Sequence, residues 1–218
     1  QNGWLMPTKT AAAPPKILEA GPIAVTASDQ GHELVHDNDE SGVGQAMRRL
    51  SQTGSDYFEV RVTDGGEQDV VCVGVAPEGN LSPAGSCLPH LSSAGAPFEM
   101  SLLLAGYNSG ARHRVPQPGW EAGSVGYHGD DGGLFVENGS AATAVPLAGD
   151  NARTFGAGDV VGCGVTFGSQ SPRTSHRIFF TLNGQATGME ASVDAGRPLH
   201  ACVGLKHGAK VVLNTGQA

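Results

Sequence analysis

Residues 57–62, which read YFEVRV, decide the fold class of this 218-residue chain. The apolar side chains Phe58, Val60 and Val62 alternate with polar ones. A period of two residues indicates a β-strand with one buried face and one solvated face. No long segment of the chain has the period of an amphipathic helix, so the chain is predicted to be built from strands.

Similar runs recur along most of the chain. Residues 69–76 read DVVCVGVA and are apolar on both faces, which predicts a strand at the centre of a sheet. A strand-like pattern begins at Gly21, and the segment 45–50 is expected to form one short helical turn. The remaining predicted strands lie near residues 23–25 and 34–35 and at residues 98–104, 123–128, 133–137, 159–167, 177–183, 198–205 and 209–214.

Turn sequences separate these predicted strands. Asn183-Gly184 directly follows a strand and tolerates the positive φ angles of a hairpin turn. Residues 129–133 (GDDGG) and 156–159 (GAGD) interrupt the chain between other runs. Many short strands without intervening helices predict an all-β fold, a bent antiparallel β-sandwich. We expect one domain at residues 21–218, preceded by a tail or linker at residues 1–20.

Composition argues against several classes of function. The formal net charge of −8 makes the surface acidic, so nucleic acid is not an expected partner. No apolar stretch approaches the roughly 20 residues that a membrane-spanning helix needs, so no membrane insertion is expected. Cys72, Cys87, Cys163 and Cys202 form no CxxC pair, which argues against a zinc site. Three of them lie in apolar runs, as buried thiols do, which predicts an intracellular, cytoplasmic location.

The order of the runs resembles that of the SPRY domain family. The resemblance rests on residues 57–60, 71–76, 126–127, 158–165 and 178–184, on Gly188, and on the closing runs 198–205 and 211–214. Each motif is weak alone, but their order over about 160 residues is specific. It implies a β-sandwich in which loops at one edge grip a short peptide segment of a partner protein.

Within that family the chain is most similar to the RanBPM type. Pro118-Gly119-Trp120 followed by residues 126–132 (GYHGDDG) carries this similarity. Residues 77–117 are longer than that type needs, which predicts an inserted segment. The LisH and CTLH helices that accompany the RanBPM domain are absent from this sequence, so membership of a ubiquitin-ligase complex does not carry over. A ubiquitin-ligase or scaffold component remains one class of partner to consider.

The resemblance and the turn sequences together select a set of candidate contact residues. The loop after the first strands carries acidic side chains, and Phe135 and residues 205–207 match positions that line the peptide pocket in SPRY proteins with a SOCS box. The predicted partner-binding residues are Asp37, Asp39, Trp120, His128, Asp130, Asp131, Phe135, Leu205, Lys206 and His207.

Several of these residues allow a structural interpretation as well. Asp130 and Asp131 lie in a glycine-rich turn, where aspartate side chains commonly bind backbone N–H groups, and metal binding is the weaker interpretation. For Phe135 the interpretation as a core residue is favoured, because apolar residues in strands are usually buried, and for Trp120 the favoured interpretation is a cover over one end of the sandwich. The loop at 36–42 begins like a calcium-binding EF-hand loop, but Arg48 occupies the position where a glutamate ligand is needed.

The sequence contains no GxSxG, GxxxxGK[ST] or HExxH motif, so we expect no catalytic residues, no metal and no cofactor. The leading interpretation is a non-catalytic module that recognises a peptide. A second is a structural module of a larger assembly, with residues 77–117 as its contact surface. A third is a carbohydrate-binding or hydrolytic jelly roll, which the lack of paired carboxylates on strands disfavours.

Overall fold

Strands account for all the regular structure in the described part of the chain. The computed structural model describes residues 17–20, 23–28, 31–37, 44–77, 117–120, 123–136, 143–145, 153–168, 175–194 and 196–214. The strands are β1 (Ile17–Ala20), β2 (Ile23–Ser28), β3 (Gly31–His36), β4 (Gly44–Arg49), β5 (Ser55–Asp64), β6 (Val71–Pro77), β7 (Val125–His128), β8 (Leu134–Val136), β9 (Thr143–Val145), β10 (Val160–Thr166), β11 (Ser175–Leu182), β12 (Gln185–Asp194), β13 (Leu199–Leu205) and β14 (Lys210–Asn214).

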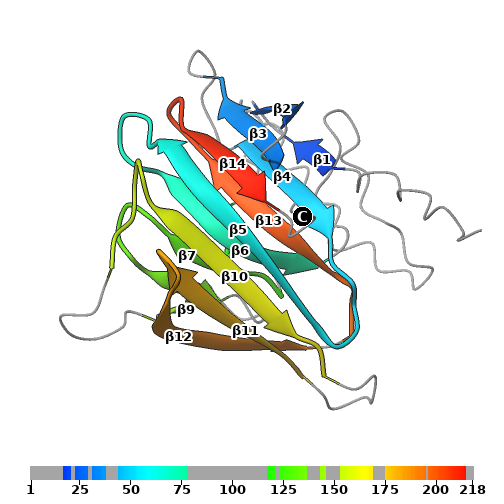
Figure 1. The fold of residues 1–218 in the computed structure, drawn as a ribbon. Coiled ribbons are helices and arrows are strands. Elements are labelled where there is room, and N and C mark those ends of the chain that lie inside the picture. The colour runs from blue at the N-terminus through cyan, green and yellow to red at the C-terminus, as the bar shows by residue number, and fades with distance from the viewer. Residues whose placement is uncertain are drawn as a thin grey trace, which may run out of the picture.

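These strands form two antiparallel sheets, which confirms the predicted fold class. One sheet has the order β1-β4-β13-β6-β7-β8-β9, and the other has the order β12-β11-β10-β5-β14-β3-β2. Figure 1 shows the second sheet lying across the first, with β5, β10 and β14 facing β6 and β13. Among the described residues, no helix has the length and apolar character needed to cross a membrane.

The period-two pattern of β5 orients its side chains as predicted. Phe58, Val60 and Val62 are buried between the sheets, whereas Tyr57 and Arg61 are exposed on the outer face. The facing sheet contributes an equivalent set of buried side chains, among them Val73, Val75, Tyr127, Leu199 and Val203. Burial of apolar side chains from both sheets stabilises the sandwich, by roughly 1.5–3 kcal/mol for each large side chain.

β6 and β13 are buried along their whole length. Each lies between two neighbours, since β13 pairs with β4 and β6, and β6 pairs with β13 and β7. This agrees with the prediction that the doubly apolar run at 69–76 is central. Cys72, Cys163 and Cys202 are buried thiols on these and neighbouring strands. Cys87 and the predicted strand at 98–104 lie outside the described residues.

The predicted helical turn at 45–50 is wrong, because these residues form β4. β4 pairs with β1 on one side and with β13 on the other. Hydrogen bonding to two neighbours outweighs the helix preference of residues such as Ala46 and Arg48, because helix propensity is a weak prior that tertiary context overrides.

Three further strands, besides β4, were not predicted. β1 lies within the stretch expected to be a tail, β9 is three residues long, and β12 has a mostly polar sequence. β12 is ten residues long and lies at the edge of its sheet, where only Met189 and Val193 are buried. Its pairing with β11 shifts register between Phe179 and Thr181, and Gly188 has a φ of 79°.

The turn between β11 and β12 has the predicted chemistry. Asn183 and Gly184 have φ angles of 53° and 75°, which suit the two-residue hairpin loop that joins these strands. The Asn183 side chain also fixes the turn to the start of β10, the neighbour of β11 in the sheet: its Oδ1 accepts a hydrogen bond from the Val160 backbone N–H at 2.9 Å. Its Nδ2 donates to Asp159 at 2.8 Å.

Candidate functional site

Several connecting segments meet at one end of the sandwich, which we call the loop end. It comprises His36 at the end of β3 and Asp37 after it, the β5–β6 turn (65–70), the β7–β8 turn (129–133), residues 153–159 and the β13–β14 turn (206–209). Backbone hydrogen bonds join these segments to one another or to adjacent strands. Written from the N–H donor to the carbonyl acceptor, they are Lys206 to Val70 (3.1 Å), Glu67 to His207 (3.2 Å), Gly129 to Val71 (2.9 Å), Phe155 to Gly129 (3.1 Å) and His36 to Ala209 (3.0 Å). The loop end is therefore a set of loops with a fixed arrangement.

Trp120, His128 and Phe135 form an aromatic cluster beside this end. The ring centroids of His128 and Phe135 are 4.2 Å apart, and Trp120 lies 5.6 Å from His128 and 6.3 Å from Phe135. The Trp120 side chain is 50% exposed, whereas Phe135 is half-buried and His128 is buried. Three predicted contact residues are thus brought together, and one presents a large aromatic surface to solvent.

The backbone around Pro118 holds Trp120 in place. The Pro118 carbonyl oxygen accepts hydrogen bonds from His128 Nε2 at 2.9 Å and from the Cys72 thiol at 3.4 Å. The Gly119 N–H donates to the Ser124 hydroxyl at 2.9 Å. Gly126 permits this approach, because a Cβ at that position would lie 2.1 Å from the Pro118 oxygen. The loop that carries Trp120 is consequently fixed at several points.

His128 is a structural member of the cluster. Only 3% of the residue is exposed, and burial lowers its pKa, although the hydrogen bond to Pro118 and the charges of Asp130 and Asp131 act in the opposite direction. A neutral ring protonated on Nε2 fits the bond to the Pro118 carbonyl. The predicted direct contact between His128 and a partner is therefore replaced by a role in supporting Trp120 and Phe135.

The two aspartates of the β7–β8 turn are in different environments. Asp131 Oδ1 accepts a hydrogen bond from the Gly133 N–H at 2.7 Å, which is the turn-stabilising role that the sequence predicted. The Asp130 side chain has no such bond among the described residues and is exposed. The described residues contain no group of three or more histidine, cysteine, aspartate or glutamate side chains that could hold a metal ion.

The β13–β14 turn corrects one prediction. Leu205 is fully buried, because it shares the inward face of β13 with Ala201 and Val203, so it cannot be a surface contact. Lys206 and His207, which follow it, are partly exposed. His207 has a φ of 53°, and its carbonyl accepts the bond from the β5–β6 turn. Asp37 is exposed at the end of β3, whereas Asp39 lies outside the described residues.

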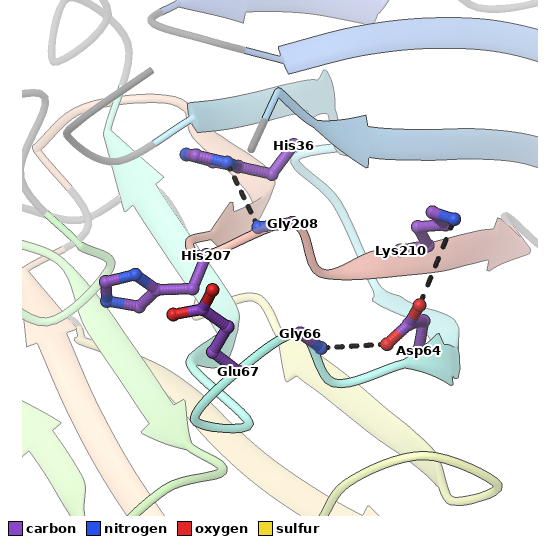
Figure 2. Close-up of a pocket in the computed structure, with 7 residues that line it drawn as sticks. All are labelled: His36, Asp64, Gly66, Glu67, His207, Gly208 and Lys210. Atoms are coloured by element: carbon purple, nitrogen blue, oxygen red, sulfur yellow. Dashed lines mark hydrogen bonds and ion pairs between the residues drawn. The ribbon is translucent and has the colours of Figure 1, made fainter. Parts of the chain in front are cut away.

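A polar recess of about 350 Å³ opens at the loop end. It is lined by His36, Asp64, Gly66, Glu67, His207, Gly208 and Lys210. Figure 2 shows Glu67 and His207 on one side of the recess and the Asp64–Lys210 ion pair on the other, with Gly208 between them. His36 is buried, and its Nδ1 accepts a hydrogen bond from the Gly208 N–H at 3.4 Å.

Of the residues that line the recess, only His207 was among the predicted contacts. Asp64, Glu67 and Lys210 come from β5, the β5–β6 turn and β14, so groups that are far apart in the sequence are brought together by strand pairing within the second sheet. Sequence reasoning missed this recess because it did not include strand pairing: β14 pairs with both β3 and β5 and places the ends of these strands side by side.

Comparison with known proteins gives a consistent result. The family model described as "SPRY domain" matches residues 55–218. The Drosophila melanogaster Ran-binding proteins 9/10 homolog is 30% identical over 181 residues, which cover 83% of this chain and 14% of that protein. Human Ran-binding protein 9 is 38% identical over 101 residues, or 46% of this chain and 12% of that protein. SPRY domain-containing protein 3 of Pongo abelii is 32% identical over 68% of this chain and 24% of its own length.

Solved structures show the same fold. A crystal structure of a human SPRY domain superposes with a TM-score of 0.56 at 24% identity and covers 89% of this chain and 96% of that one. The SPRY domain of human HERC1 superposes with a TM-score of 0.51 at 15% identity and covers 89% of this chain and 94% of that one. The chain spans less than a quarter of the length of the Ran-binding relatives, so the comparisons concern one part of those proteins.

Proposed function

The chain belongs to the SPRY domain family, a family of protein-interaction modules, and its similarity is to the RanBPM type. On this basis we propose that it recognises a short peptide segment of a partner protein through the loop end and the aromatic cluster, without catalysing a reaction. The partner class to test first is a ubiquitin-ligase or scaffold component in a reducing, cytoplasmic compartment.

One observation carries the proposal: Trp120 is half-exposed although the backbone beside it is fixed by hydrogen bonds. Interaction hot spots are enriched in tryptophan, and a residue held in place before binding loses less conformational entropy when the partner arrives. A rigidly held aromatic surface is suited to receiving an apolar side chain of a peptide.

Charge at the loop end supports a partner segment with basic or hydroxyl side chains. Asp37, Asp130 and Asp131 are exposed there, and the sequence has a net charge of −8. Exposed charges of one sign accelerate encounter with an oppositely charged partner, and added salt screens this effect. Association is therefore expected to weaken as the salt concentration rises.

The extent of the domain is also a proposal. We propose that residues 21–218 form the interaction domain, that residues 1–20 are a tail or linker, and that residues 77–117 are an inserted segment. β1 already belongs to the first sheet at residues 17–20, so the folded part starts slightly before the proposed limit.

Selection from a displayed library of random 12-residue peptides against the full chain tests the proposed function. Binding of the selected peptides is then measured by calorimetry for Trp120→Ala and Phe135→Ala. Loss of a true anchor costs about 2 kcal/mol or more, which is roughly thirtyfold in affinity. Lys206→Glu tests the adjoining turn.

Tyr57→Ala is the matched control for these variants, because Tyr57 is 37% exposed on the outer face of the other sheet. Thermal melts check that each variant folds. If Trp120→Ala and Phe135→Ala bind normally while Leu102→Ala or Leu103→Ala abolishes binding, the contact surface is the segment 77–117 and the proposal is wrong.

A further inference from the structure

The polar recess at the loop end is a built feature. Its walls come from β3, β5 and β14 of the second sheet and from the two turns that connect the sheets. Hydrogen bonds fix these walls, including the bond from the Gly208 N–H to His36 Nδ1 and the bond from the Gly66 N–H to Asp64 Oδ1 at 3.0 Å. Those two bonds use the backbone N–H groups of both glycines that line the recess. The recess therefore lacks the open cradle of N–H groups that binds an anion.

The carboxylates of the recess are available to a cation. Glu67 makes no side-chain hydrogen bond or ion pair with any described residue, and Figure 2 shows its carboxylate at the side of the recess that holds His207. Asp64 lies 3.9 Å from the Lys210 ammonium, and both side chains are about half-exposed. An exposed pair of this kind contributes about 0–1 kcal/mol, so it does not prevent Asp64 from engaging another cation.

Two carboxylates on different walls favour a guanidinium over an ammonium group. Arginine presents five N–H donors in one plane and can bridge separate acceptors, whereas lysine presents a compact point charge. The exposed carboxylates of Asp37, Asp69 and Asp130 lie in segments at the same end and make its potential more negative.

The strand order relates the recess to the aromatic cluster. His207 directly follows β13, Phe135 lies in β8, and β6 and β7 separate these strands in the sheet. The strand registers pair Phe135 with Gly126, Gly126 with Gly74 and Gly74 with Cys202, so Phe135 is level with a residue five positions before His207. Three strand spacings across the sheet amount to about 14 Å, five residues along the strands add about 16 Å, and the second sheet packs about 10 Å away. An extended peptide, at about 3.3 Å for each residue, spans the resulting distance of about 24 Å with about six to eight residues.

We propose that the recess receives an arginine side chain of the bound peptide, about six to eight residues from the residue that packs on Trp120, and that Glu67 is the main determinant of this preference. This inference rests on the proposed function and specifies the chemistry of the partner segment. The partner motif then has two parts, an apolar residue and an arginine at a fixed spacing.

The peptides selected from the displayed library test the proposal. Their sequences are expected to share an apolar residue and an arginine at the stated spacing. Replacing that arginine with glutamine should weaken binding to the unmodified chain at least tenfold, because hydrogen bonds between charged groups are the stronger class. Glu67→Gln should weaken the binding of the arginine-containing peptide by a similar factor.

A double-mutant cycle then tests whether Glu67 and the arginine are in contact. In Glu67→Gln, exchanging the peptide arginine for glutamine should change affinity less than threefold. Glu33→Gln is the matched control, because Glu33 is exposed in β3 and does not line the recess, and it should leave both peptides unaffected. Additive effects of Glu67→Gln and the peptide change would overturn the inference.

The outcomes separate this inference from the proposed function. One outcome is that the selected peptides need Trp120 for binding but are not enriched in arginine, or are enriched in an acidic residue instead. This outcome overturns the arginine proposal and leaves the peptide-binding role in place. Peptides that bind equally well to Trp120→Ala and Phe135→Ala overturn the proposed function, and the arginine proposal fails with it.

Discussion

The guanidinium of Arg48 lies 3.6 Å from the carboxylate of Asp56, and this pair joins β4 of one sheet to β5 of the other. Arg48 is only 8% exposed, and its Nε and Nη2 atoms have no hydrogen-bond partner within the described residues. Burial lowers the pKa of Arg48, against the attraction of Asp56. Asp56 also accepts hydrogen bonds from the backbone N–H groups of Ser51 and Tyr57.

Asp56→Asn is expected to destabilise the fold. The amide keeps a hydrogen-bond acceptor for the backbone but leaves the buried Arg48 charge without its counter-charge. Removing one partner of a buried pair costs about 3–5 kcal/mol, and the partial exposure of Asp56 reduces this to about 2–3 kcal/mol. Urea denaturation measures the change. Asp64→Asn, which breaks the exposed pair with Lys210, is the control, and an equal loss in both variants would contradict the prediction.

Mild acid is expected to destabilise the protein through His128 and His176. Burial lowers the pKa of both histidines in the folded chain below the ordinary value of 6.5. The unfolded chain therefore takes up protons first as the pH falls. The free energy of unfolding should have its full value above about pH 6.5 and decrease below it. Urea titrations from pH 7.5 to 5 measure this decrease, which should be smaller in His128→Gln than in the unmodified chain. The same pH dependence in the variant and the unmodified chain would show that His128 does not cause the loss of stability.

Gly126→Ala is expected to displace the loop that carries Trp120. The new Cβ would lie 2.1 Å from the Pro118 carbonyl oxygen, and overpacking of this kind costs about 1–3 kcal/mol. Trp120 fluorescence, measured with Trp4 replaced by phenylalanine, should change. Gly188→Ala is the control, because no atom lies within 4 Å of its Cβ position and only its φ of 79° is strained. It should lose stability without a change in Trp120 emission.

The two turn aspartates are expected to differ in their contribution to stability. Asp131→Ala removes the bond to the Gly133 N–H and should lower the free energy of unfolding by about 1 kcal/mol. Asp130→Ala should change it by less than about 0.5 kcal/mol, because its side chain is exposed and makes no turn bond. Thermal melts distinguish the two variants. Calorimetric titration with calcium checks the alternative, since micromolar binding lost in both variants would identify a metal site.

The four cysteines are expected to be unpaired thiols, and the buried Cys72, Cys163 and Cys202 are expected to react only after unfolding. Burial raises the pKa of Cys72 and of Cys163, which keeps their sulfurs protonated and poorly nucleophilic. Titration of the unreduced protein with a thiol reagent in denaturant should count four thiols, Cys87 included, whereas the buried ones should react slowly in the folded state. A count of two or fewer would indicate disulfides.

The sequence predicted the strands that have a distinct local pattern of apolar residues, either alternating as in β5 or continuous as in β6, and missed the strands defined by their neighbours. β5 and β6 followed from the local pattern of apolar residues. β4 has no such pattern, since its conformation depends on pairing with β1 and β13, and β12 is mostly polar because it lies at an edge. Long-range pairing of this kind is not encoded in a short sequence window.

For the candidate site too, the sequence identified single residues but not the contacts that depend on strand pairing. Trp120, His128 and Phe135 were selected individually, but their contact depends on the pairing of β7 with β8. Leu205 was selected by resemblance, although the alternation of β13 assigns it to the core with Val203. The recess could not be predicted, because Asp64 and Glu67 approach His207 only after the two sheets have formed.

The irregular pairing of β12 has a consequence for behaviour at high concentration. A regular edge strand is a template on which strands of other chains can add, as in amyloid growth. The register shift opposite Phe179 and the positive φ of Gly188 interrupt the ladder midway, and Glu190 and Asp194 place charge along the same edge. These features disfavour strand addition along the full length of β12, the longest edge strand in the described part of the chain, and so disfavour ordered aggregation there.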